Sequence, residues 1–253
     1  MYILHLSDIH YRRELGCRKK ADQGPLDGTN KKHGGVDRAA GPDGYQAMLS
    51  AMQNPLVFLD DCLDRVAGDW ERIGLVVITG DLTEDGTAED YRCLKHHIRK
   101  RIGDIPLVVT LGNHDNKRNF REGWLEEDAD SPCGLKEIGS APYNTIRRLE
   151  DTAVISFDTS VQGVPDGRMD DSQAAWLESV LKAEGKGPSI LVTHHHLLPE
   201  QGQIPPLPES RRLLSLLEHS GVSCILCGHT HHHHAGLAAG RPCHIADSLS
   251  FCG

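Results

Sequence analysis

The chain has 253 residues, of which 27 are Lys or Arg and 36 are Asp or Glu, giving a formal net charge of −9. This balance argues against a protein that holds nucleic acid mainly through a broad basic surface, because phosphate neutralisation needs clustered cations. No apolar run approaches the roughly 20 residues of a membrane span. The first residues lack the basic and apolar regions of a secretory signal. We therefore expect a cytoplasmic protein with no membrane partner and no nucleic-acid partner.

Short apolar runs recur along the chain, and polar residues follow each run directly. Runs of this kind are typical of strands buried on both faces. They comprise residues 2–6, 75–79, 107–111, 153–157, 190–193 and 224–227, with a further strand-like run at 243–246.

Helical patterns lie between these runs, at residues 56–66, 91–102, 173–181 and 208–218. Asn54 is the predicted N-cap of the first helix, with Pro55 at the first position. Thr87 opens the second helix and Ser172 caps the third. Strands that alternate with helices indicate an α/β fold with helices on both sheet faces. In such folds ligands bind on loops beyond the strand ends.

Eight cysteines occur, and in a chain of this length without a signal we expect reduced thiols. Cys224 and Cys227 form a CxxC pattern, but they lie within a strand-like run and no second pair is near. We expect them to be small buried side chains and not a zinc or redox site.

Residues 12–44 interrupt the alternation of strands and helices. The segment is rich in Gly, Lys, Arg and Asp, and it directly follows the pattern Asp8-x-His10. A loop of this length is usually functional or disordered. A lid over a site and a mobile surface insertion are both compatible with it, and as a lid its basic residues, such as Arg12 and Arg13, would steer an anionic substrate.

Metal-ligand residue types follow five of the predicted strands. Imidazole and carboxylate suit Mn, Fe, Zn, Ni or Co. Seven candidates are too many for one tetrahedral zinc ion, whereas two ions that share a carboxylate would use all seven. The neighbouring glycines Gly80, Gly112 and Gly228 allow the backbone to approach closely. The seven candidates are Asp8, His10, Asp81, Asn113, His194, His229 and His231.

These motifs, in this order, resemble the calcineurin-like metallophosphoesterase superfamily, and most nearly its bacterial cyclic-nucleotide phosphodiesterase and glycerophosphodiesterase branch. The resemblance extends from Asp8 to about Ser250 and includes Asp158-Thr159-Ser160 and the segment 167–177. It implies a single domain over residues 1–253. It further implies a four-layer α/β/β/α sandwich with mixed sheets and a dimetal site on the strand-end loops.

The resemblance also implies a role for each residue. Asp8, His10 and His231 would hold one divalent ion, and Asn113, His194 and His229 the other. Asp81 would bridge the two ions, and His114 would act on the substrate as the catalytic histidine. His195 is the alternative to His194 as a ligand. His196 and residues 232–234 have no implied role, and we expect them to be solvated loop residues.

The implied reaction is hydrolysis of small phosphodiesters, of the cyclic nucleotide or glycerophosphodiester type, by a hydroxide that two metal ions activate. His114 would stabilise the phosphoryl charge or protonate the leaving alkoxide. Relatives with an iron-bound tyrosine carry it where this chain has Glu84, so a tyrosinate-ligated site is not expected. Mn or Fe is the favoured metal, and an oligomer is compatible with the sequence.

Three other readings remain open at this point. A phosphomonoesterase or a nuclease would use the same centre, because the motifs do not fix substrate size. A non-catalytic metal-binding scaffold is a third reading, but a scaffold has no need of His114.

Overall fold

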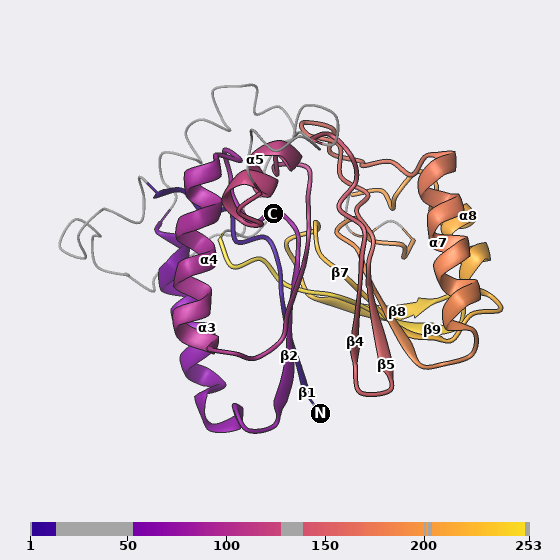
Figure 1. The fold of residues 1–253 in the computed structure, drawn as a ribbon, viewed down its shortest axis with the longest axis horizontal. Helices are drawn as coiled ribbons and strands as arrows, with labels where there is room; N and C mark the ends of the chain where they lie inside the picture. Colours follow the sequence, from indigo (N-terminus) through magenta and orange to yellow (C-terminus); the bar gives the residue numbers. More distant parts are fainter. Residues whose placement is uncertain (1, 14–52, 128–138, 200, 202–203, 251–253) are drawn as a thin grey trace, which may run out of the picture.

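The computed structural model describes residues 2–13, 53–127, 139–199, 201 and 204–250. Two β-sheets lie next to each other between two layers of helices, with α3 and α4 outside one sheet and α7 and α8 outside the other (Figure 1). This arrangement confirms the expected four-layer α/β/β/α sandwich.

The first sheet has three strands in the order β1-β2-β3, and both pairs are parallel. In its register Leu6 pairs with Ile78, and Thr79 pairs with Thr110. The strands therefore end at the same edge of the sheet. Their bounds are Tyr2–Leu6 for β1, Ile73–Thr79 for β2 and Leu107–Thr110 for β3.

The second sheet has six strands in the order β4-β5-β6-β7-β9-β8. Its four inner strands are parallel, and the two edge strands β4 and β8 run antiparallel to their neighbours. Among the described strands, only those of this sheet form both parallel and antiparallel pairs. The bounds are Thr145–Leu149 for β4, Thr152–Ser156 for β5, Ser189–Val192 for β6, Val222–Cys227 for β7, His234–Ala238 for β8 and Arg241–Ile245 for β9.

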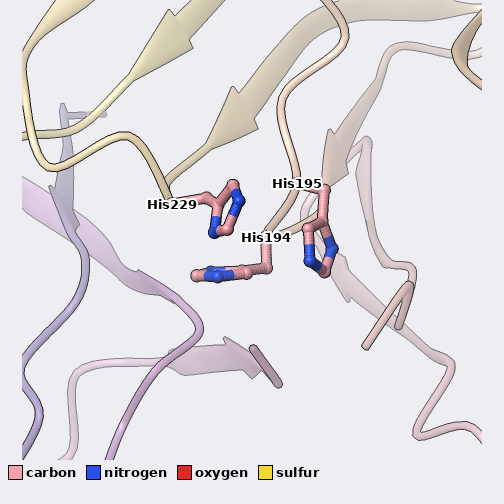
Figure 2. A group of neighbouring side chains, drawn as sticks. All are labelled: His194, His195 and His229. Atoms are coloured by element: carbon pink, nitrogen blue, oxygen red, sulfur yellow. The ribbon is translucent and has the colours of Figure 1, made fainter. Parts of the chain in front are cut away.

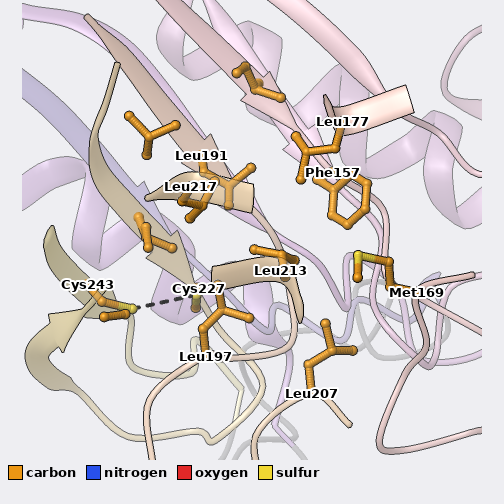
Figure 3. Packing of buried hydrophobic residues seen from close by; sticks show 14 of the residues in the cluster. Phe157, Met169, Leu177, Leu191, Leu197, Leu207, Leu213, Leu217, Cys227 and Cys243 are labelled. Atoms are coloured by element: carbon orange, nitrogen blue, oxygen red, sulfur yellow. Dashed lines mark hydrogen bonds between the residues drawn. The ribbon is translucent and has the colours of Figure 1, made fainter. Parts of the chain in front are cut away.

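Three clusters of buried apolar residues join the layers. One packs α3 and α4 on the first sheet, around Leu59, Leu94 and Ile78. A second lies between the two sheets and includes Val77 and Val192. The third packs α7 and α8 on the second sheet, and Figure 3 shows Phe157, Leu177 and Leu213 within it.

Of the CxxC residues, Cys227 is a core residue as expected, whereas Cys224 is only partly buried. Cys227 is buried beneath α8, and its Sγ lies 4.0 Å from Cys243 Sγ (Figure 3). Cys224 packs in the cluster between the sheets. The two cysteines of the pattern thus belong to different clusters and do not form one site.

The helix starts agree with the sequence in two cases. Asn54 caps α3 (Pro55–Arg65) by accepting a hydrogen bond from Leu56 N, and Thr87 caps α4 (Ala88–Ile102) by accepting from Asp90 N. The short helices Ala67–Asp69 (η2) and Lys117–Gly123 (α5) were not predicted, and α8 covers Ser210–Leu217.

The predicted cap Ser172 is wrong. The N-cap of α7 (Asp171–Glu184) is Asp170, whose side chain accepts from Gln173 N at 2.9 Å while Gln173 Oε1 accepts from Asp170 N at 3.1 Å. This reciprocal capping box satisfies two backbone donors and starts the helix earlier. Ser172 lies inside the first turn and donates its hydroxyl to Asp170.

The edge strands β4 and β8 were also not predicted. The three central residues of β4 are exposed and include Arg147 and Arg148, and β8 is exposed over most of its length. An edge strand of this kind has no continuous apolar run.

Most of the predicted insertion at residues 12–44 lies outside the described residues. Of its basic residues, Arg12 forms a two-bond ion pair with Asp85 at 2.7 and 2.8 Å, and Arg13 lies 3.8 Å from Glu89. Among the described helices, none is both long and apolar enough to cross a bilayer.

Candidate metal centre

The seven predicted ligand residues all lie just beyond the carboxyl ends of parallel strands. Asp8 and His10 follow β1, Asp81 follows β2, and Asn113 follows β3. In the second sheet, His194 follows β6, and His229 and His231 follow β7. The structure brings these loops together where the edges of the two sheets meet.

Four of these residues form a first group. Ligand atoms of Asp8, His10, Asp81 and His231 all lie within 4.8 Å of one another, and all four residues are buried. His10 Nε2 is 3.2 Å from His231 Nε2, and His231 Nε2 is 3.3 Å from Asp8 Oδ1. Two ligand atoms on one ion, each about 2.1 Å from it, are spaced by roughly 3.0–3.4 Å. The first group matches that spacing.

A second group lies around His194. Its Nε2 is 3.3 Å from Asn113 Oδ1, and its ring is 4.9 Å from the ring of His229. Figure 2 shows His195 beside these two rings, and ligand atoms of the three histidines lie within 4.8 Å of one another. Of the alternative ligands His194 and His195, His194 is the one whose Nε2 faces Asn113 and Asp81.

Asp81 lies between the two groups. Its Oδ2 is 3.6 Å from His10 Nε2 and 3.5 Å from His194 Nε2. Its Oδ1 accepts a hydrogen bond from the backbone N–H of His114 at 2.9 Å. One carboxylate oxygen thus faces a histidine from each group, which is the position that a bridging carboxylate needs.

The hydrogen bonds of the Nδ1 atoms of His194 and His10 show whether the Nε2 atoms of these rings can bind a cation. His194 Nδ1 donates to the Thr79 carbonyl at 2.7 Å, and His10 Nδ1 donates to Glu84 Oε2 at 2.7 Å. In a neutral imidazole the Nε2 atom then carries a lone pair. These lone pairs face the oxygens of Asp81 and Asn113, which also accept. Acceptors that face one another need a proton or a metal cation between them, so the donor set fits divalent ions.

The charges of the buried groups agree with this fit. Burial alone would raise the pKa of Asp8, but the imidazoles of His231, His194 and His10 lower it well below its usual value. Burial also opposes ionisation of Asp81, and His194 and His10 again lower its pKa. Burial and neighbouring His194 lower the pKa of His229 to about 3. The carboxylates are therefore ionised and His229 is neutral, as metal ligands are.

The backbone at this site is held in an unusual conformation. Asp8, His10, Asp81, His229 and His231 all have φ between 44° and 76°, and they account for five of the eight described non-glycine residues with positive φ. Such conformations cost free energy and concentrate at functional sites. The turns orient the side chains toward one another.

The predicted role of glycine beside the ligands is confirmed by close contacts. A Cβ on Gly80, whose φ is +85°, would lie 2.5 Å from His194 Nδ1, and one on Gly112 would lie 2.2 Å from Asp81 Oδ1. Neither position has room for a side chain.

His114 lies beside the centre and is partly exposed, with a side-chain exposure of 26%. Its ring packs edge to face on that of His10, with centroids 4.8 Å apart. Burial alone would lower the pKa of His114, but the hydrogen bond to Glu84 and the charge of Asp81 outweigh it and raise the pKa to about 9. In the protein without metal, His114 is therefore a cation at neutral pH.

Sequence reasoning missed the supporting roles of two residues, Glu84 and Asp115, and named a third, His195, as the alternative to His194 as a ligand. Glu84 contacts His10 and His114, and the buried Asp115 accepts from three backbone N–H groups of the loops after β2 and β3 and from the Tyr91 hydroxyl on α4. His195 Nδ1 lies 2.7 Å from Thr159 Oγ1. Their position in the sequence could have indicated them, because each of these residues lies within three positions of a predicted ligand.

His196 was expected to be a solvated loop residue, and this is wrong. Its side chain is buried, and its Nε2 is 3.3 Å from the Ile204 carbonyl. The chain folds back over it at Ile204, which the sequence pattern did not reveal. His232, His233 and His234 are all exposed, as expected. His234 differs from the expectation in one respect, because it is the first residue of β8 and not part of a loop.

A cavity of about 660 Å³ lies at the start of α5, whose N-cap Asn116 follows His114 by two residues. Asn116 and Gln162 form part of its wall and are hydrogen-bonded to each other at 2.8 Å. Lys117, Arg118 and Arg168 also line the cavity, with Lys117 paired to the buried Asp158 at 2.6 Å. Asp170 lines the cavity as well, so basic side chains outnumber acidic ones in the lining, which suits an anionic ligand.

The comparison that decides the family covers most of the chain. Residues 1–233 match the model of the calcineurin-like phosphoesterases. The chain belongs to this family. The family and the residues above together support a centre of two divalent metal ions.

Curated relatives carry phosphodiesterase names. A probable cyclic nucleotide phosphodiesterase of Rhodococcus erythropolis is 31% identical over 198 residues, covering 76% of this chain and 63% of the relative. The glycerophosphodiester phosphodiesterase GpdQ of Enterobacter lignolyticus is 28% identical and covers 91% of this chain and 71% of the relative. The chain thus spans less than two thirds of the Rhodococcus protein.

A solved structure agrees with the fold. A dimetal phosphatase of Danio rerio superposes with a TM-score of 0.60 at 15% identity, covering 98% of this chain and 87% of that one. At this identity the likeness concerns the α/β fold with its mixed sheet.

Proposed function

We propose that this chain hydrolyses small phosphodiesters, of the cyclic nucleotide or glycerophosphodiester type, at a centre of two divalent metal ions. The observation that carries the proposal is Asp81 Oδ2, which faces the lone pairs of His10 and His194 at 3.6 and 3.5 Å. The names of the relatives support the choice of diesters. Because both sheets supply residues to this site, we treat residues 1–253 as one catalytic domain.

Each group of residues would hold one ion. Asp81, whose Oδ2 faces a histidine of each group, would contribute to both ions. When bound, two such ions lower the pKa of a water molecule and neutralise phosphoryl oxygens. The remaining ligands are Asp8, His10 and His231 for the first ion, and Asn113, His194 and His229 for the second.

His114 acts on the substrate and not on the metal. Its partly exposed ring and its raised pKa support a proton donor beside the centre. As hydroxide derived from water adds to phosphorus and the ester P–O bond breaks, His114 donates a proton to the leaving alkoxide, which departs as an alcohol, and the proton that the water released returns to His114 through solvent. The basic residues of the neighbouring cavity attract the anionic diester.

We propose Mn or Fe as the native metal. Imidazole, carboxylate and amide oxygen are ligands that suit these ions. Glu84 stands where tyrosinate-ligated relatives have tyrosine, and its carboxylate accepts a hydrogen bond from His10. A redox-tuning phenolate is therefore not part of the proposal.

The test is a substrate and metal panel on the purified chain. The protein is stripped with a chelator and reloaded with Mn, Fe, Co, Ni or Zn. Its metal content is measured together with hydrolysis of bis-p-nitrophenyl phosphate, p-nitrophenyl phosphate, a cyclic nucleotide and a glycerophosphodiester. We expect two ions per chain and faster turnover of diesters than of the monoester.

Two results would contradict the proposal. Faster hydrolysis of p-nitrophenyl phosphate than of any diester would make the chain a monoesterase. Binding of two ions without turnover of any ester would leave a metal-binding scaffold.

A further inference from the structure

Glu84 is a buried carboxylate that contacts two histidines of different predicted roles. Its Oε2 is 2.7 Å from His10 Nδ1 and 3.4 Å from His114 Nδ1, and 3% of its side chain is exposed. The two rings themselves pack edge to face at 4.8 Å. A single oxygen therefore faces both a predicted metal ligand and the predicted proton donor.

The backbone delivers Glu84 to this position. Its N–H donates to the Tyr11 carbonyl at 3.1 Å, and Tyr11 N–H donates to the Leu82 carbonyl at 3.1 Å. His10 N–H donates in turn to the Asp81 carbonyl at 2.9 Å. The loop after β2 is thus paired with the loop after β1, and this pairing fixes Glu84 beside His10 before any ligand binds.

The contact with His10 determines which ring nitrogen carries the proton. A carboxylate accepts, so the proton lies on Nδ1 and the lone pair on Nε2. Nε2 is the nitrogen that faces Asp81 Oδ2 at 3.6 Å and His231 Nε2 at 3.2 Å. Glu84 thereby prepares the nitrogen that a metal ion needs.

A direct metal-ligand role for Glu84 fits the geometry less well. Ligand atoms of His10, Glu84 and His114 do lie within 4.8 Å of one another. However, Glu84 binds the Nδ1 edge of the His10 ring, whereas Asp8, Asp81 and His231 surround the Nε2 side. An ion among those three residues has the imidazole ring between it and Glu84.

We propose that Glu84 is a positioning residue shared by the metal centre and the proton donor, holding the His10 tautomer and the His114 ring with one carboxylate. The proposal rests on the proposed function for its catalytic half, whereas its metal-binding half stands without it.

The experiment compares Glu84→Ala and Glu84→Gln with the wild-type chain. Asp85→Asn is the matched control, because Asp85 is the neighbouring carboxylate but is exposed and paired with Arg12. Metal affinity is measured by competition with a chromogenic chelator. Turnover is measured with one diester that releases p-nitrophenolate and one that releases an alkoxide.

We expect Glu84→Ala to weaken the binding of one of the two ions about 10–100-fold, the usual effect of losing a partner of a metal-bound histidine. Glu84→Gln retains an acceptor oxygen and should recover part of this loss. In both variants kcat should fall more for the alkoxide substrate than for the p-nitrophenolate substrate, with a smaller change in KM. Asp85→Asn should match the wild type.

The outcomes separate this proposal from the proposed function. Wild-type metal affinity in Glu84→Ala would overturn the proposed role of Glu84 in holding His10 for metal binding. Equal losses of kcat for both leaving groups would overturn its proposed role in positioning His114. A third ion that is lost with Glu84 would make it a ligand and overturn the proposal. If the wild-type chain hydrolyses no ester, the proposed function fails while the metal-affinity result still tests Glu84.

Discussion

Three consecutive residues of the loop after β3 have different surroundings. Asn113 is buried and faces His194, and Asp115 is fully buried among backbone donors. His114 lies between them and is the one that remains partly exposed, with its backbone N–H bonded to Asp81. The turn that sends Asn113 toward the ligands thus leaves His114 at the rim, where a substrate can reach it.

His114→Ala should lower kcat by about 10²–10⁴-fold, the usual contribution of a positioned acid, while two ions remain bound. The loss should be small for a p-nitrophenolate leaving group, which needs little protonation, and large for an alkoxide. Steady-state kinetics with both substrates and metal analysis of the variant provide the measurement.

Two results would redefine His114. Similar losses for both leaving groups would assign it to stabilising the phosphoryl charge. Loss of an ion from the variant would make it a ligand.

At the scale of elements, Asp115 ties the loop after β3 to the loop after β2. Its carboxylate accepts from Leu82 N at 3.1 Å, Thr83 N at 3.3 Å and Gly112 N at 2.9 Å. It also accepts from the hydroxyl of Tyr91, on α4, at 2.8 Å. The two loops that carry Asp81 and Asn113 are therefore held in register by one buried side chain.

Asp115→Ala should lower the free energy of unfolding by at least about 3 kcal/mol, because several buried donors lose their acceptor at about 1–3 kcal/mol each. Urea unfolding of the metal-free variant provides the measurement. Asp85→Ala is the control, since an exposed ion pair contributes about 0–1 kcal/mol. A cost for Asp115→Ala that equals the control would show that the loops do not depend on this carboxylate.

The sequence indicates which residues gather at the candidate centre, but it does not indicate the residues that support them. Asp8, Asp81 and His194 could be found because each follows a buried strand, and an apolar run is visible in the chain. Glu84 and Asp115 could not, because their roles depend on which backbone donors and rings face them after folding. The edge strand β4 was missed for a related reason, since its exposed residues bear no apolar pattern.

At the scale of the whole molecule, the candidate centre joins the two sheets. Apolar side chains such as Val77 and Val192 fill the space between them. At the carboxyl edge this apolar packing is replaced by ionised carboxylates of the first sheet and imidazoles of the second. Without cations, acceptor atoms of the two sheets face one another at this edge.

Metal binding should therefore stabilise the entire fold. A ligand that binds the folded state at 100 times its Kd adds about 2.7 kcal/mol, which for a chain of this size raises Tm by roughly 5–10 °C. Thermal unfolding is followed by circular dichroism in excess Mn and after chelation, and the two curves should differ by about this amount. Asp81→Ala removes the carboxylate that faces both groups, so its Tm should change little between the two conditions. A wild-type Tm that is the same with and without metal would contradict the view that the centre holds the sheets together, and an undiminished shift in Asp81→Ala would exclude Asp81 as the bridge.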